Sequence, residues 1–192
     1  MKKIISLFLA GVMMLAMVSC SESKKEDSKD DVSAESPLAL LNTVWDSYSD
    51  DEKFPVAGGD YTEENQNPEG PGKYSLDDPN AVENALGMPI ESVSKLEDAA
   101  SIMHMMNANT FTCSVLRAKK SDDVSTLAKD MKESILHQRQ WMCGIPDKVV
   151  FYTIGKDLIT AFGEKEIIDT FKTKLTKAFP DAKLVSEDNI TE

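Results

Sequence analysis

The chain is 192 residues long, and its 33 aspartates and glutamates outnumber its 21 lysines and arginines, which gives a formal net charge of −12. A surface this acidic repels phosphate backbones and anionic lipid headgroups. Composition therefore excludes nucleic acid as a partner, and it disfavours direct attraction to an anionic bilayer. A length of 192 residues is sufficient for one domain with a single core.

The first twenty residues, MKKIISLFLAGVMMLAMVSC, have the pattern of an export signal. Two lysines make a positive start, and the apolar run that follows, up to Val18, is too short to span a hydrocarbon core of about 30 Å. Ser19, a small residue, stands directly before Cys20. This arrangement resembles the lipobox of bacterial lipoproteins, in which residues 1–19 are the signal peptide and Cys20 is acylated. More than one acyl chain gives stable anchoring to a membrane.

The next part of the chain is mostly polar and has little periodicity. Residues 20–36 hold the cysteine and a run of Ser, Lys, Asp and Glu, which predicts a disordered acidic tether. Pro37 begins a short helix with one apolar face. Residues 50–77 are rich in Gly, Pro, Asn and acid, and they are predicted to form a long irregular loop, a feature that is usually functional or disordered. Pro79 begins a second short helix.

From residue 102 onward, strand patterns alternate with helix patterns. Strands are predicted at 102–106, 111–118, 148–154 and 157–162, and helices at 121–142 and 164–178. The longer predicted helix has an apolar stripe made of Val124, Leu127, Ala128, Met131, Ile135 and Met142. Gly155 suits a two-residue type II′ hairpin.

These elements predict the fold class α+β, with the order strand–strand–helix occurring twice. We expect a ββα-ββα two-layer sandwich: a four-stranded antiparallel sheet covered on one face by two helices, with short N-terminal helices beside it. The single domain is predicted to span residues 37–186, and residues 187–192 to form a C-terminal tail.

Two stretches carry a resemblance to a known family, FTCSVLRAKKSDDVSTLAKDMKESILHQRQ and DKVVFYTIGKDLITAFGEKEIIDTFKTKLTKAF. With the lipobox and the acidic tether, they resemble the uncharacterised lipoproteins of Gram-positive anaerobes that carry domain of unknown function 4358. The resemblance covers residues 37–184 and implies an extracytoplasmic, anchored domain. It implies no activity and no functional residues, because the family has none assigned.

Catalytic chemistry has little support in the sequence. The only two histidines are His104 and His137, and neither a nucleophile elbow nor a phosphate-binding loop occurs. The chain is therefore predicted not to be an enzyme and to need no cofactor. Within the irregular loop, Asp60 and three glutamates offer only a weak site for a hard cation such as calcium.

One short run is a candidate for a metal site. Met103, His104 and Met105 provide thioether and imidazole ligands, which suit Cu(I). On a strand, however, His104 points away from the two methionines, and methionine also fills irregular cores well, so core packing is the preferred interpretation. The remaining cysteines, Cys113 and Cys143, allow one disulfide, which export permits but does not require.

The sequence therefore predicts a domain held by lipid on Cys20 at the outer leaflet of the cell membrane, or at the outer membrane if the host has two. The preferred function is a non-catalytic binding or accessory domain, with a protein partner contacting the loop 50–77 or the uncovered face of the sheet. The alternative is a lipoprotein that binds a small ligand or a metal ion of the copper type.

Overall fold

The computed structural model describes residues 34–60 and 62–191. The predicted signal peptide, Cys20 and most of the predicted tether lie outside these residues. No helix in the described part of the chain is both long enough and apolar enough to cross a membrane.

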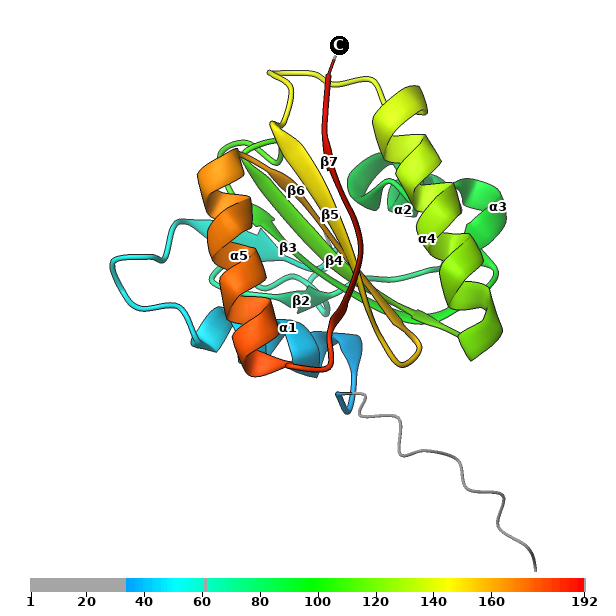
Figure 1. Cartoon of the computed structure of the whole chain (residues 1–192), viewed down its shortest axis with the longest axis horizontal. Coiled ribbons are helices and arrows are strands. Elements are labelled where there is room, and N and C mark those ends of the chain that lie inside the picture. Colours follow the sequence, from blue (N-terminus) through cyan, green and yellow to red (C-terminus); the bar gives the residue numbers. More distant parts are fainter. Residues whose placement is uncertain (1–33, 61, 192) are drawn as a thin grey trace, which may run out of the picture. The chain divides into compact units, whose positions relative to one another are not determined.

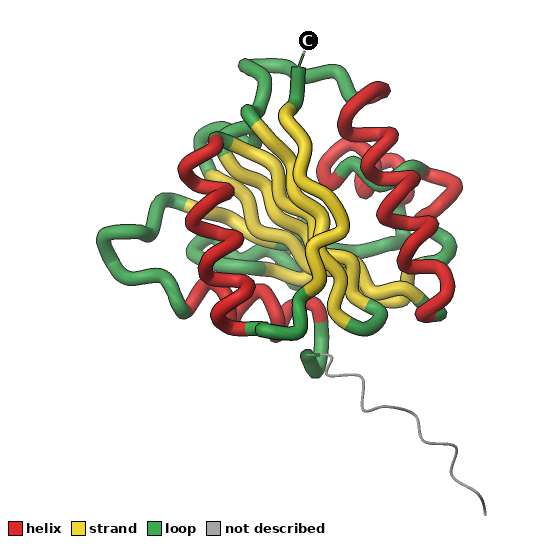
Figure 2. Tube along the Cα trace, in the orientation of Figure 1, coloured by secondary structure: helices red, strands yellow, loops and turns green. Residues whose placement is uncertain are grey.

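The described residues form an α+β domain around one antiparallel sheet, drawn in yellow in Figure 2. Its strands are β1 (Val56–Gly58), β2 (Gly72–Lys73), β3 (Leu96–His104), β4 (Phe111–Ala118), β5 (Lys148–Ile154), β6 (Asp157–Gly163) and β7 (Lys183–Asn189). Their order across the sheet is β1-β3-β4-β6-β5-β7, and β2 also pairs with β3. The hairpins β3–β4 and β5–β6 make the centre of the sheet, because β4 pairs with β6.

Helices cover both faces of this sheet (Figure 1). The helices are α1 (Pro37–Asp46), α2 (Pro79–Leu86), α3 (Ile90–Val93), α4 (Val124–Glu133) and α5 (Lys165–Ala178), and α4 continues into a π-helix at Ser134–Gln138. Side chains of α1 and α5 share one buried cluster with one face of the sheet. Side chains of α2, α3 and α4 share a second cluster with the opposite face.

The prediction that both long helices cover a single face is wrong, and so is the two-layer arrangement. Strand β4 shows the reason, because it is buried on both sides. Cys113 and Val115 pack in the cluster with α5, whereas Leu116 and Ala118 pack in the cluster with α4. A strand that is apolar on both faces needs cover on both faces. The uncovered sheet face that was predicted as a partner surface therefore does not exist in the described domain.

The sheet is also larger than predicted. Strand β3 begins at Leu96, not at residue 102, and β7 occupies residues that were assigned partly to a C-terminal tail. Ile190, just after β7, is buried in the cluster with α4. Strand β7 was missed because it lies at the edge of the sheet, where its polar side chains remain mostly exposed and give no apolar alternation.

The long predicted helix at 121–142 is shorter in the structure, but its buried stripe is confirmed up to Ile135. The π-helix ends at Gln138, and Met142, the last predicted member of the stripe, is 79% exposed. Within the β5–β6 hairpin, Gly155 has a φ of 54°, as the predicted type II′ turn requires.

The predicted loop 50–77 contains β1 and β2, which lie along the outer edge of β3. Gly58 permits this arrangement, because a Cβ atom there would lie 2.3 Å from the backbone nitrogen of Gly72. Asp60 organises the rest of the loop: its buried carboxylate accepts hydrogen bonds from Thr62, from Asn65 and from the backbone of Ser75. Burial opposes its ionisation, but these hydrogen bonds outweigh burial and lower its pKa to about 2.

Candidate functional site

The chain has two arginines, and they occupy opposite ends of the sheet. Arg117 forms a two-pronged ion pair with Asp157, with Nε–Oδ1 at 2.7 Å and Nη2–Oδ2 at 2.8 Å. Its remaining donors bind the backbone oxygens of Ala34 and Glu35. Because the hydrogen bond to buried Asp157 favours the charged guanidinium, the pKa of Arg117 is raised. Both carboxylate oxygens of Asp157 and all three guanidinium nitrogens are paired within the domain, which indicates a structural role.

We call this end of the sheet, with Arg117 and Asp157, the proximal end, because the described chain enters the domain here at Ala34. The segment 34–36, which the sequence analysis places in the tether, is therefore already held by the domain at its carbonyls. The opposite end is the distal end, formed by Phe162 and by the loops 105–110 and 139–147. The two ends are separated by the length of β6 (Asp157–Gly163), about 20 Å at 3.3 Å per residue.

Arg139 lies at the distal end, directly after the π-helix, and it is bound very differently. Its guanidinium donates to the backbone oxygens of Glu83 (3.4 Å) and Asn84 (3.0 Å), near the C-terminus of α2. The guanidinium carbon lies 4.9 Å from the ring centre of Trp141 and 5.2 Å from that of Phe162. Among the described residues, no aspartate or glutamate forms an ion pair with Arg139.

Local sequence explains how Arg139 reaches this position. The chain leaves the helical conformation at Arg139, whose backbone is extended. The backbone N–H of Arg139 donates the last hydrogen bond of the π-helix to the carbonyl oxygen of Ser134. Gly87 ends α2 in the left-handed conformation with a φ of 86°. A Cβ atom at Gly87 would lie 2.8 Å from the side chain of Ile135, so glycine is needed for α2 and the π-helix to approach each other. π-helical turns occur frequently at functional sites.

A surface cleft of about 410 Å³ opens beside Arg139. All of its lining residues are polar: Glu83, Asn84, Ser134, Gln138, Arg139 and Gln140. A guanidinium has five N–H donors, and the two carbonyls of α2 use only part of them. Partial burial lowers the pKa of Arg139 because it disfavours the charged form. A carboxylate that entered the cleft would supply the missing counter-charge in the two-pronged geometry that arginine favours.

The predicted copper ligands do not converge. His104 Nδ1 accepts hydrogen bonds from the backbone N–H groups of Met106 (3.2 Å) and Asn107 (3.3 Å), and its ring stacks on Phe54 at 5.6 Å. Met103 pairs across the sheet with Ala57 and Thr112, one position before His104 and thus on the opposite face. The described residues contain no group of three or more His, Cys, Asp or Glu side chains that could hold a metal ion.

Both described cysteines are free, so the disulfide that the sequence allows is not formed. Cys113 is completely buried beneath α5, and this burial raises the pKa of its thiol well above the usual value. Cys143 is exposed in the distal loop 139–147. The two side chains belong to different environments, and Cys113 has the core role that its strand pattern indicates.

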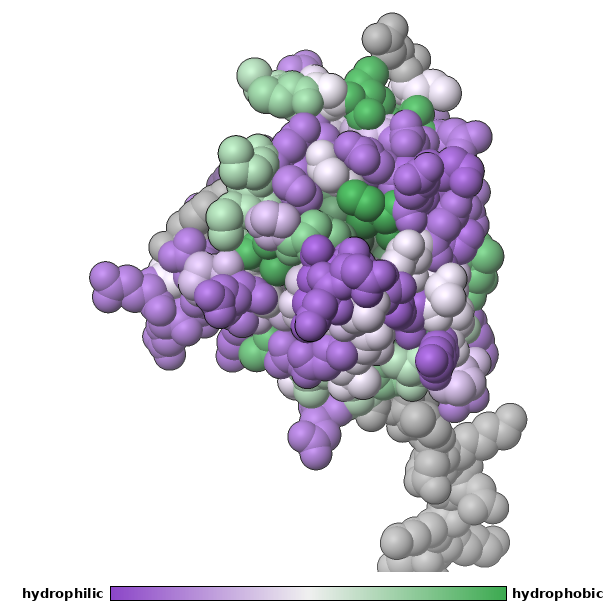
Figure 3. Space-filling model, turned by 90° about the vertical axis from the view of Figure 1, so that its left-hand side faces the viewer, coloured by the Kyte–Doolittle hydropathy of each residue, from purple (hydrophilic) through white to green (hydrophobic). Residues whose placement is uncertain are grey.

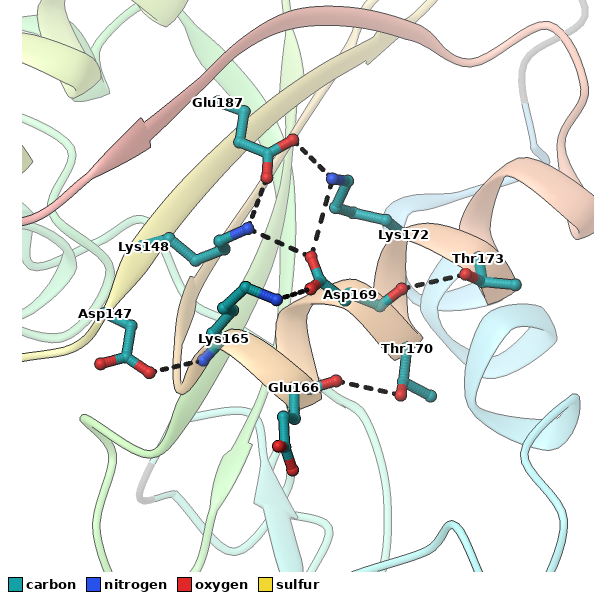
Figure 4. Close-up of polar contacts among 9 residues, drawn as sticks. All are labelled: Asp147, Lys148, Lys165, Glu166, Asp169, Thr170, Lys172, Thr173 and Glu187. Atoms are coloured by element: carbon teal, nitrogen blue, oxygen red, sulfur yellow. Dashed lines mark hydrogen bonds and ion pairs between the residues drawn. The ribbon is translucent and has the colours of Figure 1, made fainter.

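A network of charged side chains joins β5, α5 and β7 (Figure 4). Lys148 forms ion pairs with Glu187 (2.6 Å) and Asp169 (3.1 Å), and Lys172 bridges the same two carboxylates. Hydrogen bonds, first from Lys165 and then from Lys148, lower the pKa of Asp169 to about 2, and the bond to Glu187 raises the pKa of Lys148. Each charge has an opposite partner, so the network holds β7 in place and does not resemble a vacant site.

The fold and the Arg139 cleft define an α+β domain with helices on both faces of an antiparallel sheet and a polar cleft beside a partly buried arginine. No family model matches the chain, and neither a curated protein nor a solved structure matches it. Membership of the lipoprotein family named above therefore remains a prediction. Sequence reasoning missed Arg139; the available signal was the short polar run HQRQW where the helix pattern breaks off.

Proposed function

We propose that this protein is a lipid-anchored, extracytoplasmic binding domain without catalytic activity, and that it holds a small zwitterionic ligand in the Arg139 cleft. The ligand class is that of an amino acid or a short peptide. The anchor rests on the lipobox pattern that ends at Cys20. The ligand site rests on one observation: a partly buried guanidinium without an acidic partner faces a polar cleft.

The lining of the cleft favours this ligand class. Arg139 offers a cationic fork for a carboxylate, and Glu83 places a carboxylate in the same cleft that can accept an ammonium group. Glu83 also disfavours ligands with two negative charges, such as phosphate, by like-charge repulsion. Asn84, Gln138 and Gln140 add amide groups that can donate to and accept from a peptide unit.

The cleft lies away from the start of the described chain. The described chain begins beside Arg117 at the proximal end, whereas Arg139 stacks on Phe162 at the distal end. The cleft and the point where the described chain begins therefore lie at opposite ends of the sheet.

A titration tests the ligand site. Isothermal calorimetry with free amino acids and dipeptides should show saturable binding for at least one member of the panel, and Arg139→Gln should weaken that binding by at least about 10-fold. Lys177→Gln is the matched control, because it removes the same charge from the exposed side of α5, on the other face of the sheet. If no member binds, or if the two variants behave alike, the ligand site is wrong.

A separate experiment tests the anchor. Cells that express the chain and are fed a labelled fatty acid should incorporate the label, and Cys20→Ala should abolish the incorporation. Label that persists in the Cys20→Ala variant would contradict the lipobox interpretation without affecting the cleft.

A second proposal concerns a protein partner at the loop 50–77. Within that loop, the segment 62–69 is mostly exposed and carries Glu63, Glu64 and Glu69, which favours a basic partner. Crosslinking in intact cells should capture one dominant protein, and deletion of residues 63–66 should abolish its capture. Capture of only abundant neighbours would overturn this proposal.

A further inference from the structure

The distal end of the domain carries a group of exposed sulfur side chains. Met105 is 51% exposed, Met106 is 80% exposed and Met142 is 79% exposed, and the neighbouring Cys143 is exposed with a free thiol. Burying methionine in a core is the ordinary use of this residue, and Met88 and Met131 follow that rule in the same domain. Figure 3, which faces the left-hand side of Figure 1, shows hydrophobic surface in its upper half among hydrophilic side chains.

Two loops far apart in the sequence bring these side chains together. Asn107 Nδ2 donates to the backbone oxygen of Cys143 (3.2 Å), and Asn109 Nδ2 donates to the backbone oxygens of Met142 (2.5 Å) and Gly144 (2.7 Å). These bonds fasten the β3–β4 turn directly onto the loop 139–147. They place the backbone of Met142 and Cys143 against the turn that carries Met105 and Met106.

The chemistry of this group differs from that of the rest of the surface. Thioethers and a thiolate are soft ligands, which select Cu(I) over hard cations such as calcium or magnesium. Each methionine has three rotatable bonds, so thioethers from adjacent loops can adjust to one ion. The backbone of Cys143 has a φ of 65°, a conformation that a non-glycine residue adopts at some cost.

We propose that Met105, Met106, Met142 and Cys143 form a surface site for one Cu(I) ion. Binding replaces the proton of the Cys143 thiol with the metal, so one proton is released and no electron is transferred. The site differs from the run Met103–His104–Met105 that the sequence singles out, since His104 and Met103 take no part. It is also independent of the Arg139 cleft, because it uses none of the residues that line it.

Competition for Cu(I) tests the proposal directly. The whole chain, with Cys20→Ser in every sample so that the Cys20 thiol cannot compete, is titrated in detergent without oxygen against Cu(I) held by bicinchoninate; the thiol of Cys113 is buried. The parent should withdraw one equivalent of Cu(I) with release of one proton. Met106→Leu combined with Met142→Leu, and separately Cys143→Ser, should each weaken the binding by at least about 10-fold.

Met103→Leu is the matched control, and its affinity for Cu(I) should equal that of the parent. All these side chains except Met103 are exposed, and Leu and Ser keep similar sizes, so folding is preserved and can be checked by circular dichroism. A parent that withdraws no Cu(I) would overturn the proposal, as would variants that bind as tightly as the parent. The proposal would also be overturned if Met103→Leu lost Cu(I) binding while the other variants kept it, because Met103 in β3 would then be a ligand.

Discussion

Each end of the sheet carries one arginine, and the two arginines have opposite surroundings. At the proximal end, Arg117 lies against a buried aspartate, and every charge of the pair is satisfied within the domain. At the distal end, Arg139 lies on two aromatic rings beside an open polar cleft and has no acidic partner among the described residues. A guanidinium that is desolvated without a counter-ion retains binding capacity that a paired one has already used.

This contrast separates an end of the sheet with structural contacts from an end with exposed polar and sulfur groups. The proximal end binds the start of the described chain, whereas the distal end carries the polar cleft and the exposed sulfur side chains. The exposed methionines and Cys143 lie on loops that follow the π-helix or connect β3 to β4, whereas the cleft is lined by residues of α2, of the π-helix and of the chain directly after it. Loops carried by a rigid sheet are the usual place for binding groups.

The largest expected effect comes from breaking the proximal pair. Arg117→Met leaves the buried charge of Asp157 without a partner, so the free energy of unfolding should fall by about 3–5 kcal/mol, as measured by urea denaturation. The double variant Arg117→Met with Asp157→Leu should recover most of this loss. If the free energy of unfolding of the single variant fell by less than about 1 kcal/mol, the ion pair would not be an important source of stability.

Arg139→Gln should have a smaller effect on folding. It removes two hydrogen bonds to carbonyls that water can reach, so the loss should be about 1–2 kcal/mol in the same urea assay. The comparison between the ends requires Arg139→Gln to cost less stability than Arg117→Met. Equal losses would mean that both arginines are structural.

Acid should weaken the charged network of Figure 4. Asp169 has a pKa lowered to about 2, and the pKa of Glu187 is lowered chiefly by its hydrogen bond from Lys148. A depressed carboxylate pKa adds stability that is complete above the unfolded value, near 4, and that is lost as the pH falls toward 2. The protection factors of the β7 amides, which correct for the slower intrinsic exchange in acid, should therefore fall between pH 4 and pH 2, and Asp169→Asn should reduce this pH dependence.

The smallest effect is expected at the exposed sulfur side chains. Met142→Ser changes a side chain that is 79% exposed, so the free energy of unfolding should stay within about 0.5 kcal/mol of the parent value. A thermal denaturation curve checks this. A larger loss would mean that Met142 packs against the domain in solution.

The central hairpins and the long helices could be predicted from the sequence, because their apolar periodicity is strong. The start of β3 could not, since LEDAAS lacks β-branched residues and carries two acids. The presence of helices on both faces of the sheet could have been inferred from FTCSVLRA. Its apolar residues occupy both odd and even positions, so they point to both faces of the strand. Trp141 is a local neighbour of Arg139, but Phe162, Glu83 and Asn84 are distant in the sequence, and contacts at such distances leave no local pattern.

One measurement tests the central claim most directly. Because the chain has two arginines, a sample labelled with ¹⁵N-arginine gives two Nε–H signals, which Arg139→Gln assigns. On titration with the amino acid or dipeptide that binds best in calorimetry, the signal of Arg139 should shift and saturate while that of Arg117 stays in place. If both signals stay in place, or if Arg117 shifts instead, the Arg139 cleft is not the ligand site.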